Sequence, residues 1–395
     1  REVILVLQSS SFPEAVMSDV IGLVLARASQ RYLGEFYTPP IIARHLIDLS
    51  GFQKTDLVAG KRVVDPACGG GIILAEVARR TVANSRNLPA NQVLSSISNN
   101  LFGFDIQPFA VMLTRSLLLY ACSPLLEKIP AESWPSFEGA QLRDPLLRRD
   151  YWPGSQRKFH YIIGNPPFAR VKKKQLGYAE AYQEILYGHP NLYQMFLWWS
   201  VKSAEDNSRI SFLLPQSILT GTFSKKLRER LFETTSLVSV TRMIEGKGVV
   251  SDADQQMMAV CLQVKPTRDT PCTRHVAIRM SRNGDDALDC ASLEVEYSKV
   301  VRKQDRSSVI WLVSDNSIDY DILDVIEEDC DEIAELERLN YGTGEYVWNR
   351  NKELLQSEEV ENAVPLVSAV SVGPYEFTFP YSGPHPSHIR QFSLV

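Results

Sequence analysis

The sequence has no apolar run that approaches the ~20 residues a membrane-spanning helix needs. Its six cysteines form no C-x-x-C pair, so neither a zinc site nor a disulfide framework is expected, and the expected compartment is a reducing cytoplasm. A strong charge of one sign is also lacking, since the net charge is −5 over 395 residues. This balance argues against a protein that coats nucleic acid with a uniformly basic surface, but it allows a local basic cleft.

Two features are missing at the ends of the chain. The first residues, Arg1 to Leu7, are too few and too acidic for a signal peptide, and there is no initiator Met. The C-terminal residues contain several prolines and stop at Val395 without a clear closing helix or strand. We therefore expect the sequence to be an excerpt from a longer chain, either truncated or ordered only in part within its C-terminal region.

The sequence does contain an alternation of short apolar strands with helix-length segments. The expected strands are 62–65, 101–105, 159–163, 209–214, 237–244 and 257–264, and the expected helices are 72–80, 109–120, 192–204 and 225–232. Strands separated by helices predict an α/β fold in which a mostly parallel sheet is covered on both faces. In such sheets, ligands bind beyond the carboxyl ends of the strands.

The character of the sequence changes near Lys265. Residues 265–286 are polar, and residues 315–337 form an acidic stretch with helical periodicity, for which a solvated helix is favoured over a partner-binding tail. We therefore expect an N-terminal helical segment (1–30), a large α/β domain (31–265) and a remainder (266–395) that begins a second, α+β domain.

The first functional motif is the glycine-rich turn Asp65-Pro66-Ala67-Cys68-Gly69-Gly70-Gly71, between a strand and a helix. Glycine lets the backbone turn tightly and approach a ligand closely. The turn is neither G-x-G-x-x-G nor a phosphate-binding P-loop, which argues against a dehydrogenase. The Asp65 carboxylate suits the cationic amino-acid end of S-adenosylmethionine and would repel a pyrophosphate. The alternative is an ordinary glycine-rich turn.

The second motif is Gly103-Phe104-Asp105-Ile106, in which an acid ends the next strand. A carboxylate at this place in a nucleotide-binding α/β sheet accepts two hydrogen bonds from the vicinal hydroxyls of a ribose. A helix N-cap is the alternative role for Asp105. Asp65 and Asp105 are separated by more than the usual ~20 residues, so we expect an insertion around residues 83–100.

The third motif, Asn165-Pro166-Pro167-Phe168, directly follows a strand and is the most specific of the three. It suits methylation of an amine conjugated to a ring, because the delocalised lone pair of such an amine is a poor nucleophile. The Asn165 side chain and the Pro166 carbonyl can accept hydrogen bonds from the two N–H groups of the amine. The two prolines hold that carbonyl in place. Phe168 offers a face on which an extruded base can stack. The alternative is a rigid Pro-Pro turn.

These motifs, with Gly34-Glu35-Phe36-Tyr37-Thr38-Pro39-Pro40 before them, occur in an order that resembles the gamma class of amino-methylating DNA methyltransferases. The resemblance covers residues 36–264 well and the remainder loosely. It implies a doubly wound, seven-stranded methyltransferase sheet, S-adenosylmethionine as cofactor, and methyl transfer to adenine N6 in duplex DNA with base flipping. The implied setting is a bacterial restriction-modification system of type I or IIG, or a related defence system, with neither a metal nor a membrane.

The resemblance also implies roles for individual residues. The expected cofactor-binding residues are Tyr37, Thr38, Pro39, Asp65, Ala67, Cys68, Gly69, Asp105, Ile106, Asp144 and Asn165. The expected catalytic residues are Asn165, Pro166, Pro167 and Phe168. Asp144, which follows a weak strand, is the match for an acid near the adenine of the cofactor. Residues 191–196 and 342–344, with Trp348, also resemble the class. Residues 266–395 are expected to begin the DNA target-recognition region, and flanking segments to carry a nuclease or specificity region.

One departure from the class concerns the pocket for the flipped base. The class usually has a second aromatic residue shortly before the strand 257–264, but the matching stretch, Gly248-Val249-Val250-Ser251-Asp252, has none. We expect either Val249 or Val250 to pack there, or an aromatic residue to come from elsewhere in the chain.

Basic residues gather around the third motif. Arg143, Arg148, Arg149, Arg157 and Lys158 precede it, and Arg170, Lys172, Lys173 and Lys174 follow it. We expect a rim that binds DNA phosphates, with Arg170 and the three lysines as the DNA-binding residues. A solvated lysine loop is the alternative.

Two other functional classes stay open. The Asn-Pro-Pro-aromatic motif also serves RNA-guanine and protein-glutamine methyltransferases, although these do not explain the segment 37–39. The non-enzymatic alternative is a DNA-specificity module with a decayed methyltransferase fold, against which the intact Asp65, Asp105 and Asn165 argue.

Overall fold

The computed structural model describes residues 38–147, 158–170, 179–189, 191–243, 256–266, 271–281, 290–304 and 308–329, together with five short strands between residues 355 and 394. The chain divides into two compact units, residues 1–324 and 325–395. The expected helical segment 1–30 lies outside the described residues. No helix in the described part of the chain is long and apolar enough to cross a bilayer.

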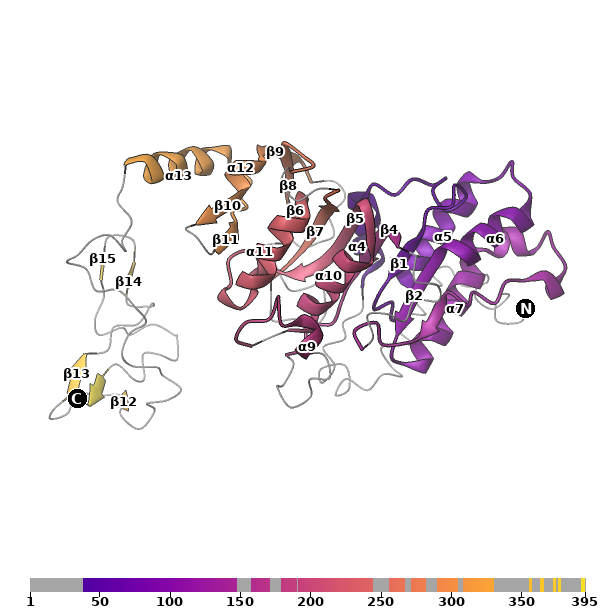
Figure 1. Cartoon of the computed structure of the whole chain (residues 1–395), viewed down its shortest axis with the longest axis horizontal. Helices are drawn as coiled ribbons and strands as arrows, with labels where there is room; N and C mark the ends of the chain where they lie inside the picture. The colour runs from indigo at the N-terminus through magenta and orange to yellow at the C-terminus, as the bar shows by residue number, and fades with distance from the viewer. Residues whose placement is uncertain are drawn as a thin grey trace. The chain divides into compact units, whose positions relative to one another are not determined.

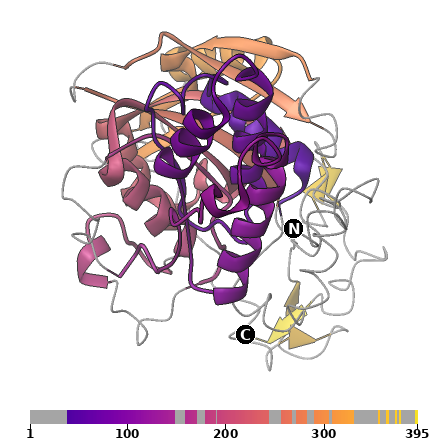
Figure 2. The ribbon, with the colours of Figure 1, turned by 90° about the vertical axis from the view of Figure 1, so that its right-hand side faces the viewer.

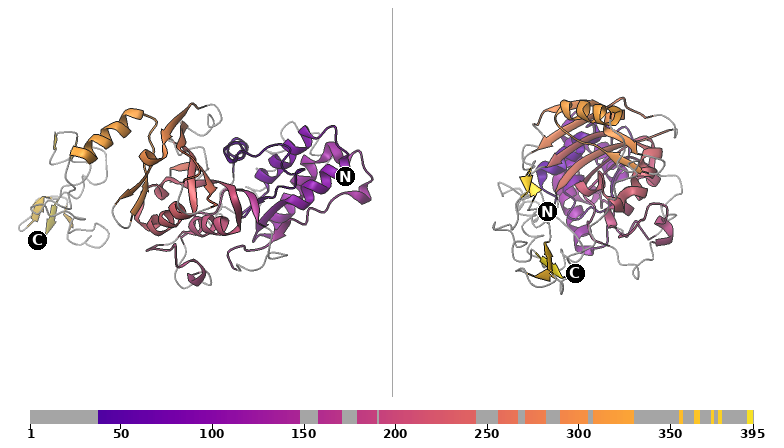
Figure 3. Two further views of the ribbon diagram at one scale, coloured as in Figure 1. Left: turned by 45° about the horizontal axis from the view of Figure 1, so that its top comes forward. Right: turned by 90° about the vertical axis from the view of Figure 1, so that its left-hand side faces the viewer.

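A nine-stranded mixed sheet is the framework of the first unit (Figure 1). Its order is β3 (Ala140–Leu142), β2 (Leu101–Asp105), β1 (Val63–Asp65), β4 (Phe159–Gly164), β5 (Ala204–Pro215), β7 (Met257–Val264), β6 (Thr235–Met243), β8 (His275–Ser281) and β9 (Ser292–Glu296). The strands from β3 to β5 pair in parallel, whereas β7 runs antiparallel between β5 and β6. The six strands expected from the sequence and the weak strand before Asp144 are thus all present. Strands β8 and β9 extend the sheet beyond β6 (Figure 3).

Helices cover both faces of this sheet. In β4, Tyr161 and Ile163 belong to one core cluster and Ile162 to the other, because successive side chains of a strand point to opposite faces. The first face is covered by α4 (Pro40–Ser50), α5 (Ile72–Asn84), α6 (Ala90–Asn100) and α7 (Pro108–Ala121), of which the purple helices face the viewer in Figure 2. The second face is covered by α10 (Leu192–Ser203) and α11 (Lys225–Thr234).

Two sequence expectations are refined by this topology. The insertion expected around residues 83–100 is helix α6, which runs directly into β2. The sheet continues past Lys265, where the change in polarity suggests a domain boundary, because β8 pairs with β6 and β9 pairs with β8. The boundary between the compact units therefore falls at Asp324. A target-recognition role for residues 266–395 stays a prediction.

The remaining elements are short, apart from one acidic helix. Residues 317–329 of the acidic stretch form α13 (Ser317–Asp329). Its exposed side chains include four large apolar ones, those of Ile318, Ile322, Val325 and Ile326, so a solvated helix stays a prediction. The others in the first unit are α8 (Ser123–Leu126), α9 (Ala179–Tyr182), α12 (Tyr297–Val300), the hairpin of β10 (Val301–Gln304) and β11 (Ser308–Trp311), and the 3-10 helices Ala131–Ser133, Gln216–Ile218 and Thr222–Ser224. In the second unit, β12 (Leu355–Gln356), β16 (Phe392–Leu394) and β13 (Ala363–Pro365) form one sheet, and β14 (Val372–Gly373) pairs with β15 (Glu376–Phe377).

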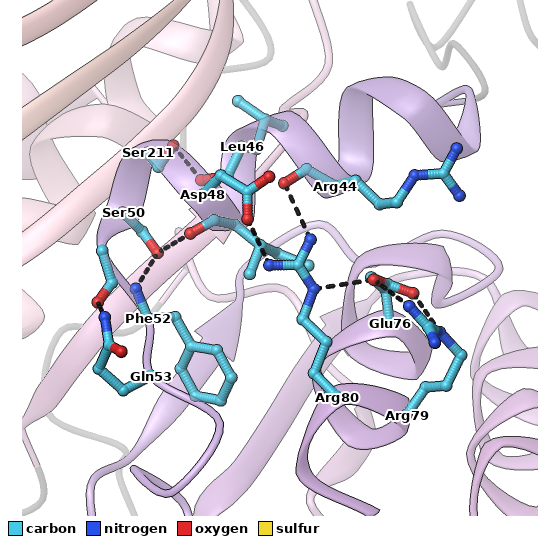
Figure 4. Close-up of polar contacts among 12 residues, drawn as sticks. Arg44, Leu46, Asp48, Ser50, Phe52, Gln53, Glu76, Arg79, Arg80 and Ser211 are labelled. Atoms are coloured by element: carbon cyan, nitrogen blue, oxygen red, sulfur yellow. Dashed lines mark hydrogen bonds and ion pairs between the residues drawn. The ribbon is translucent and has the colours of Figure 1, made fainter. Parts of the chain in front are cut away.

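Helix α4 is tied to α5 by an ion-pair network around Arg80 (Figure 4). The Arg80 guanidinium donates to Glu76 Oε1 at 2.8 Å, to the Asp48 carboxylate of α4, and to the Arg44 carbonyl at 3.4 Å. Arg79 donates to both oxygens of the same Glu76. Burial alone would raise the pKa of Glu76, but the hydrogen bonds from the two arginines lower it below its ordinary value. Glu76 is therefore ionised at neutral pH and joins the two helices through Arg80.

Two buried hydrogen bonds fix α4 on the sheet as well. Ser211 Oγ of β5 donates to the Leu46 carbonyl at 2.7 Å, and His45 Nε2 lies 2.8 Å from Thr241 Oγ1 of β6. Burial lowers the pKa of His45 to about 4, so its imidazole is neutral at physiological pH. Because α4 begins at Pro40, these contacts also fix the position of Thr38, just before the helix.

We expect Arg80→Met to lower the free energy of unfolding by about 1.5–3 kcal/mol, because it removes the charged hydrogen bond to the largely buried Glu76 carboxylate together with the more exposed bond to Asp48. Arg79→Met is the matched control. The Arg79 side chain is 52% exposed and shares Glu76 with Arg80, so its loss should cost less than about 1 kcal/mol. Urea unfolding followed by circular dichroism compares the two variants. Equal losses would show that Arg80 does not hold α4 on α5.

Candidate functional site

Four polar side chains lie at one edge of the sheet, beyond the carboxyl ends of neighbouring parallel strands. Asp65 ends β1, Asp105 ends β2, Asn165 directly follows β4, and Asp144 comes shortly after β3. Their strands are adjacent, in the order β3-β2-β1-β4. The chain leaves β1 for β2 and β3 on one side and returns to β4 on the other. This edge is therefore the switch point at which doubly wound sheets bind ligands.

Asp65 is the most deeply buried of these acids, with 2% of its surface exposed. Its Oδ1 accepts a hydrogen bond from Ala67 N at 3.1 Å. Burial raises the pKa of Asp65 to about 8, and the charge of Asp105 adds to the rise. A Cβ on Gly164 would lie 2.9 Å from the same oxygen, so β4 passes the carboxyl group closely only because this residue is glycine. Without a cation beside it, the Asp65 carboxyl is largely protonated at neutral pH.

Asp105 connects the first two motifs. Its Oδ2 accepts from Gly69 N at 3.0 Å, and its Oδ1 accepts from Gln107 N at 2.8 Å. The cap position of α7 is Gln107, so Asp105 lies two residues before it. Burial raises the pKa of Asp105 too, although these backbone N–H groups partly offset the rise. Each carboxylate oxygen has a second lone pair with which to accept from a ligand.

The glycine-rich turn is held in shape by Thr114 of α7. Thr114 Oγ1 donates to the Gly69 carbonyl at 2.9 Å and lies 3.6 Å from Cys68 Sγ. Gly71, with φ of 84°, is the N-cap of α5, and a Cβ there would come within 2.7 Å of the Thr114 hydroxyl. Burial raises the pKa of the Cys68 thiol well above its ordinary value, so Cys68 serves the packing of the turn and is not a reactive nucleophile.

The other expected cofactor positions on this side differ in exposure. Ile106, next to Asp105, leaves 50% of its surface exposed. Asp144 is half-buried, and its Oδ1 accepts from Leu146 N at 2.9 Å. Arg143 N donates to the Asp105 carbonyl at 2.7 Å, which brings the segment containing Asp144 alongside Asp105.

Asn165 contacts the segment in front of α4. Its Nδ2 donates to Thr38 Oγ1 at 3.1 Å, across 127 residues of sequence. Thr38 is 7% exposed, and Pro166 is buried as well. An amide whose nitrogen is held in this way has a fixed orientation. Helix α4, through its contacts with α5 and the sheet, therefore determines how the Asn165 side chain is presented.

Helix α10 fixes the backbone that follows Asn165. Its N-cap residue, Asn191, donates from Nδ2 to the Phe168 carbonyl at 2.8 Å, and Asn191 and Gln194 form a capping box. The Phe168 ring meets Tyr193 edge-on, with 6.4 Å between the ring centroids. The Asn-Pro-Pro-Phe turn is thus held at its start by Thr38 and at its end by α10.

Sequence reasoning does not find two of these contributors, Gly164 and Thr114, and it includes Asn191 only within the segment 191–196, without its role as a helix cap. Nothing in the local sequence marks Gly164 or Thr114, because each acts on a residue of another element. Asn191 has a signal that could have revealed it, since Asn191-Leu192-Tyr193-Gln194 has the spacing of a capping box.

The basic residues that the structure describes do not all lie at this edge. Lys158 precedes β4 and so lies at the opposite edge of the sheet from Asn165, about 20 Å away along a six-residue strand. Its inclusion in the expected basic rim is therefore wrong. Arg143 lies over the Phe104 ring, 5.6 Å from its centroid. Arg170 is exposed, and its backbone pairs with Asn191 beside the third motif.

Several expected residues lie outside the described part of the chain. They are Tyr37, Arg148, Arg149, Arg157, Lys172, Lys173, Lys174, the stretch 248–252, the glycine pair 342–344 and Trp348. Their roles stay predictions. Within the described ranges, no group of three or more His, Cys, Asp or Glu side chains is placed to hold a metal ion.

Comparison with known proteins relates the chain to DNA modification enzymes. Residues 99–249 match the family model of the Eco57I restriction-modification methylase. The type II methyltransferase M.BstVI of Geobacillus stearothermophilus is 22% identical over 211 residues, which are 52% of this chain and 37% of that protein. M.BsuBI of Bacillus subtilis is 22% identical over 342 residues, 85% of this chain and 62% of that protein. The adenine-specific methyltransferase PglX of Streptomyces coelicolor is 25% identical over 206 residues, 40% of this chain and 16% of that protein. The chain therefore spans less than two thirds of the length of each of these relatives.

Solved structures bear on the fold. The ATP-dependent type ISP restriction-modification enzyme LlaBIII, bound to DNA, matches with a TM-score of 0.53 at 14% identity, over 76% of this chain and 25% of that enzyme. At this identity the likeness concerns the fold alone. The expected doubly wound α/β sheet is confirmed.

We expect Asp65→Asn to stabilise the ligand-free protein increasingly as the pH rises. The Asp65 carboxyl has a folded pKa of about 8 against an ordinary value of 3.8, so between these values the unfolded chain has lost a proton that the folded chain keeps. Stability from this group is therefore lost as the pH rises toward 8. From about pH 5.5 to about pH 8.5, the difference in unfolding free energy between variant and parent should widen by at least ~1.4 kcal/mol, the equivalent of one pKa unit. Thermal and urea unfolding at both pH values give this difference, and parallel curves would contradict the assignment.

Proposed function

We propose that this chain, part of which matches the Eco57I restriction-modification methylase family, transfers a methyl group from S-adenosylmethionine to the N6 amine of adenine in duplex DNA. One observation carries the proposal. Asn165 of the Asn-Pro-Pro-Phe motif lies at the sheet edge that also bears Asp65 and Asp105, and Thr38 holds its amide. A group suited to an amine and acids suited to the cofactor thus come from adjacent strands.

The residues at this edge fit S-adenosylmethionine. The buried Asp65 carboxylate suits the cationic amino-acid end of the cofactor, since a cation beside it offsets the burial that raises its pKa. Asp105 can accept from the ribose hydroxyls, and the exposed Ile106 offers an apolar surface to the adenine ring. At Gly69, with φ of 51°, no described atom lies within 4 Å of the place a Cβ would take, so a ligand can approach the backbone closely. When bound, the cofactor supplies an electrophilic methyl group.

Other residues complete the proposed cofactor site. We infer that Tyr37, Thr38 and Pro39 close over the methionine end of the cofactor. Ala67 and Cys68 form the floor of the turn below it, and Asp144 lies toward the adenine amine. The segment 37–39 then has two tasks, because Thr38 also contacts Asn165.

Asn165 and Pro166 prepare the amine for attack. The N6 lone pair is delocalised into the adenine ring, so the nitrogen is planar and weakly nucleophilic. Two acceptors, Asn165 Oδ1 and the Pro166 carbonyl oxygen, accept hydrogen bonds from its two N–H groups. These bonds favour a tetrahedral nitrogen whose lone pair is free to react. Pro166 is buried and followed by Pro167, so its carbonyl needs little reorganisation. Asparagine does not titrate, so its role as an acceptor does not depend on a tuned pKa. The nitrogen loses one of its two protons to water once it carries the methyl group.

Phe168 is the proposed stacking partner of the flipped base. Its ring is half-buried and held edge-on by Tyr193, which leaves part of its surface for a base. Arg170, with Lys172, Lys173 and Lys174, is proposed to bind phosphates. Adenine as the base is supported by the relative named as adenine-specific. DNA as the substrate is supported by the match to a restriction-modification methylase family and by the likeness to a restriction-modification enzyme bound to DNA.

A comparison of three substrates tests the function. The full chain is given radiolabelled S-adenosylmethionine with genomic duplex DNA, with total RNA, or with a release-factor protein. Label on DNA adenine supports the proposal, whereas label on RNA or on protein glutamine would favour the corresponding alternative class. Cofactor binding without transfer to any of the three would favour a DNA-specificity module. Single-molecule sequencing of DNA from cells that express the protein then identifies the base and the target site.

We expect Asn165→Ala to lower methyl transfer by several orders of magnitude and to leave cofactor affinity nearly intact. The amide acts mainly on the base, and a preorganised group of this kind contributes about 3–4 kcal/mol to a transition state. Single-turnover transfer and calorimetric titration with S-adenosylmethionine measure the two effects separately. Turnover within about tenfold of the parent rate would remove Asn165 from the catalytic role.

Thr38→Val should slow transfer about 10- to 100-fold, because it removes the hydroxyl that holds the Asn165 amide while keeping the size of the side chain. Thr38→Ser is the matched control, since it keeps the hydroxyl, and its rate should stay within a few-fold of the parent. Calorimetry with the cofactor separates this effect from any loss of binding. Equal rates for the valine and serine variants would mean that the contact does not orient Asn165.

A further inference from the structure

An exposed aromatic pair lies beyond the residues assigned so far. Phe223, in the 3-10 helix Thr222–Ser224 after β5, leaves 45% of its surface exposed. The His189 ring meets it edge-on, with 5.2 Å between the ring centroids. Gly188, with φ of 61°, lies directly against Phe223, because a Cβ there would be 2.5 Å from Phe223 Cδ1. The Phe223 ring therefore packs against the backbone of Gly188, and part of its surface remains exposed to solvent.

The first turn of α10 connects this pair to the Asn-Pro-Pro-Phe turn. Asn191 Nδ2 donates to the Phe168 carbonyl at 2.8 Å, and Gln194 Nε2 donates to the Phe223 carbonyl at 3.2 Å. Tyr193 contacts the Phe168 ring, and its hydroxyl lies 3.0 Å from Ser224 Oγ. One helical turn thus holds both the inner aromatic residue, Phe168, and the outer one, Phe223.

The charges around the pair are suited to a polyanion. Arg170 is exposed and pairs through its backbone with Asn191, and Lys226 is exposed in the first turn of α11, shortly after Phe223. His189 is exposed as well. The acid on the preceding segment, Glu184, accepts a hydrogen bond from Trp198 Nε1 at 2.7 Å. Exposed basic residues therefore come from two segments near the pair, the one that bridges to Asn191 and the first turn of α11.

We propose that Phe223 and His189 form a stacking platform for DNA bases next to the extruded nucleotide, with Arg170 and Lys226 bound to the flanking phosphates. The inference rests on the proposed function. When a nucleotide leaves the duplex, the bases beside it lose a stacking partner, and an exposed ring can replace that partner whatever the sequence. The platform lowers the cost of base extrusion, whereas Phe168 receives the extruded base itself.

Two short duplexes that share one strand test the platform by fluorescence anisotropy with the full chain. One is fully paired, and the other has a complement that lacks the thymine opposite a single adenine, which is therefore bulged. The parent should prefer the bulged duplex. Phe223→Leu keeps an apolar side chain on Gly188 but has no ring, and it should weaken binding of the bulged duplex about 5- to 100-fold, with a smaller effect on the paired one. Lys226→Ala should weaken both duplexes similarly and flatten the salt dependence.

Controls separate this inference from the proposed function. Leu88→Ala, at an apolar position 39% exposed before α6, should change neither affinity, and every variant should bind S-adenosylmethionine like the parent. If the parent methylates DNA and Phe223→Leu binds the bulged duplex as tightly as the parent does, the platform is overturned and the proposed function stands. If the parent neither binds DNA nor methylates it, both are overturned.

Discussion

The candidate site depends on the pairing of β1 with two strands at once. β1 has three residues, all of them buried, and it bonds in parallel to β2 through Val63 and Leu101 and to β4 through Val63 and Tyr161. This shared register brings the ends of three strands to one edge, although they lie far apart in the sequence. Helix α4 packs against the sheet, and its bonds to α5, β5 and β6 fix the position of Thr38. Thr38 in turn contacts Asn165, directly after β4. Fold stability and site geometry therefore share the same few contacts.

The buried Asp65 carboxyl sets stability against ligand binding. Burial raises its pKa to about 8, and Gly164 packs against its oxygen, so ionising it in the ligand-free protein is unfavourable. A neutral residue of the same shape would suit the fold better at neutral pH. The charge on Asp65 becomes favourable only when a cation lies beside it. The residue therefore destabilises the ligand-free protein but can strengthen the binding of a cationic ligand. Such conflicts between stability and activity are common at functional sites.

The sequence predicted most of what is local and little of what joins distant segments. Strands β2 and β7 have the expected bounds, and the three motifs lie where a strand ends, because an apolar run and the turn after it are contiguous in the chain. The contact between Asn165 and Thr38 depends on how α4 docks, which no local pattern encodes. Strand β8 is partly exposed and β9 is a short strand at the end of the sheet, so their polar flanks resemble a linker. Lys158 is close to Asn165 in the sequence but far from it in space, because a whole strand separates them.

The position of β7 has a consequence for synthesis of the protein. β7 follows β6 in the chain yet lies between β5 and β6 in the sheet, with antiparallel bonds to both. While the chain emerges from the ribosome, β5 therefore presents a long apolar edge with no partner, and β6 cannot join the sheet until Val264 has been made. At roughly 5–20 residues per second, translation of the segment from the end of β5 to the end of β7 takes a few seconds. During that interval the nascent protein exposes the unpaired edge of β5, with which other chains can pair. The edge is covered once β7 pairs with β5 on one side and with β6 on the other.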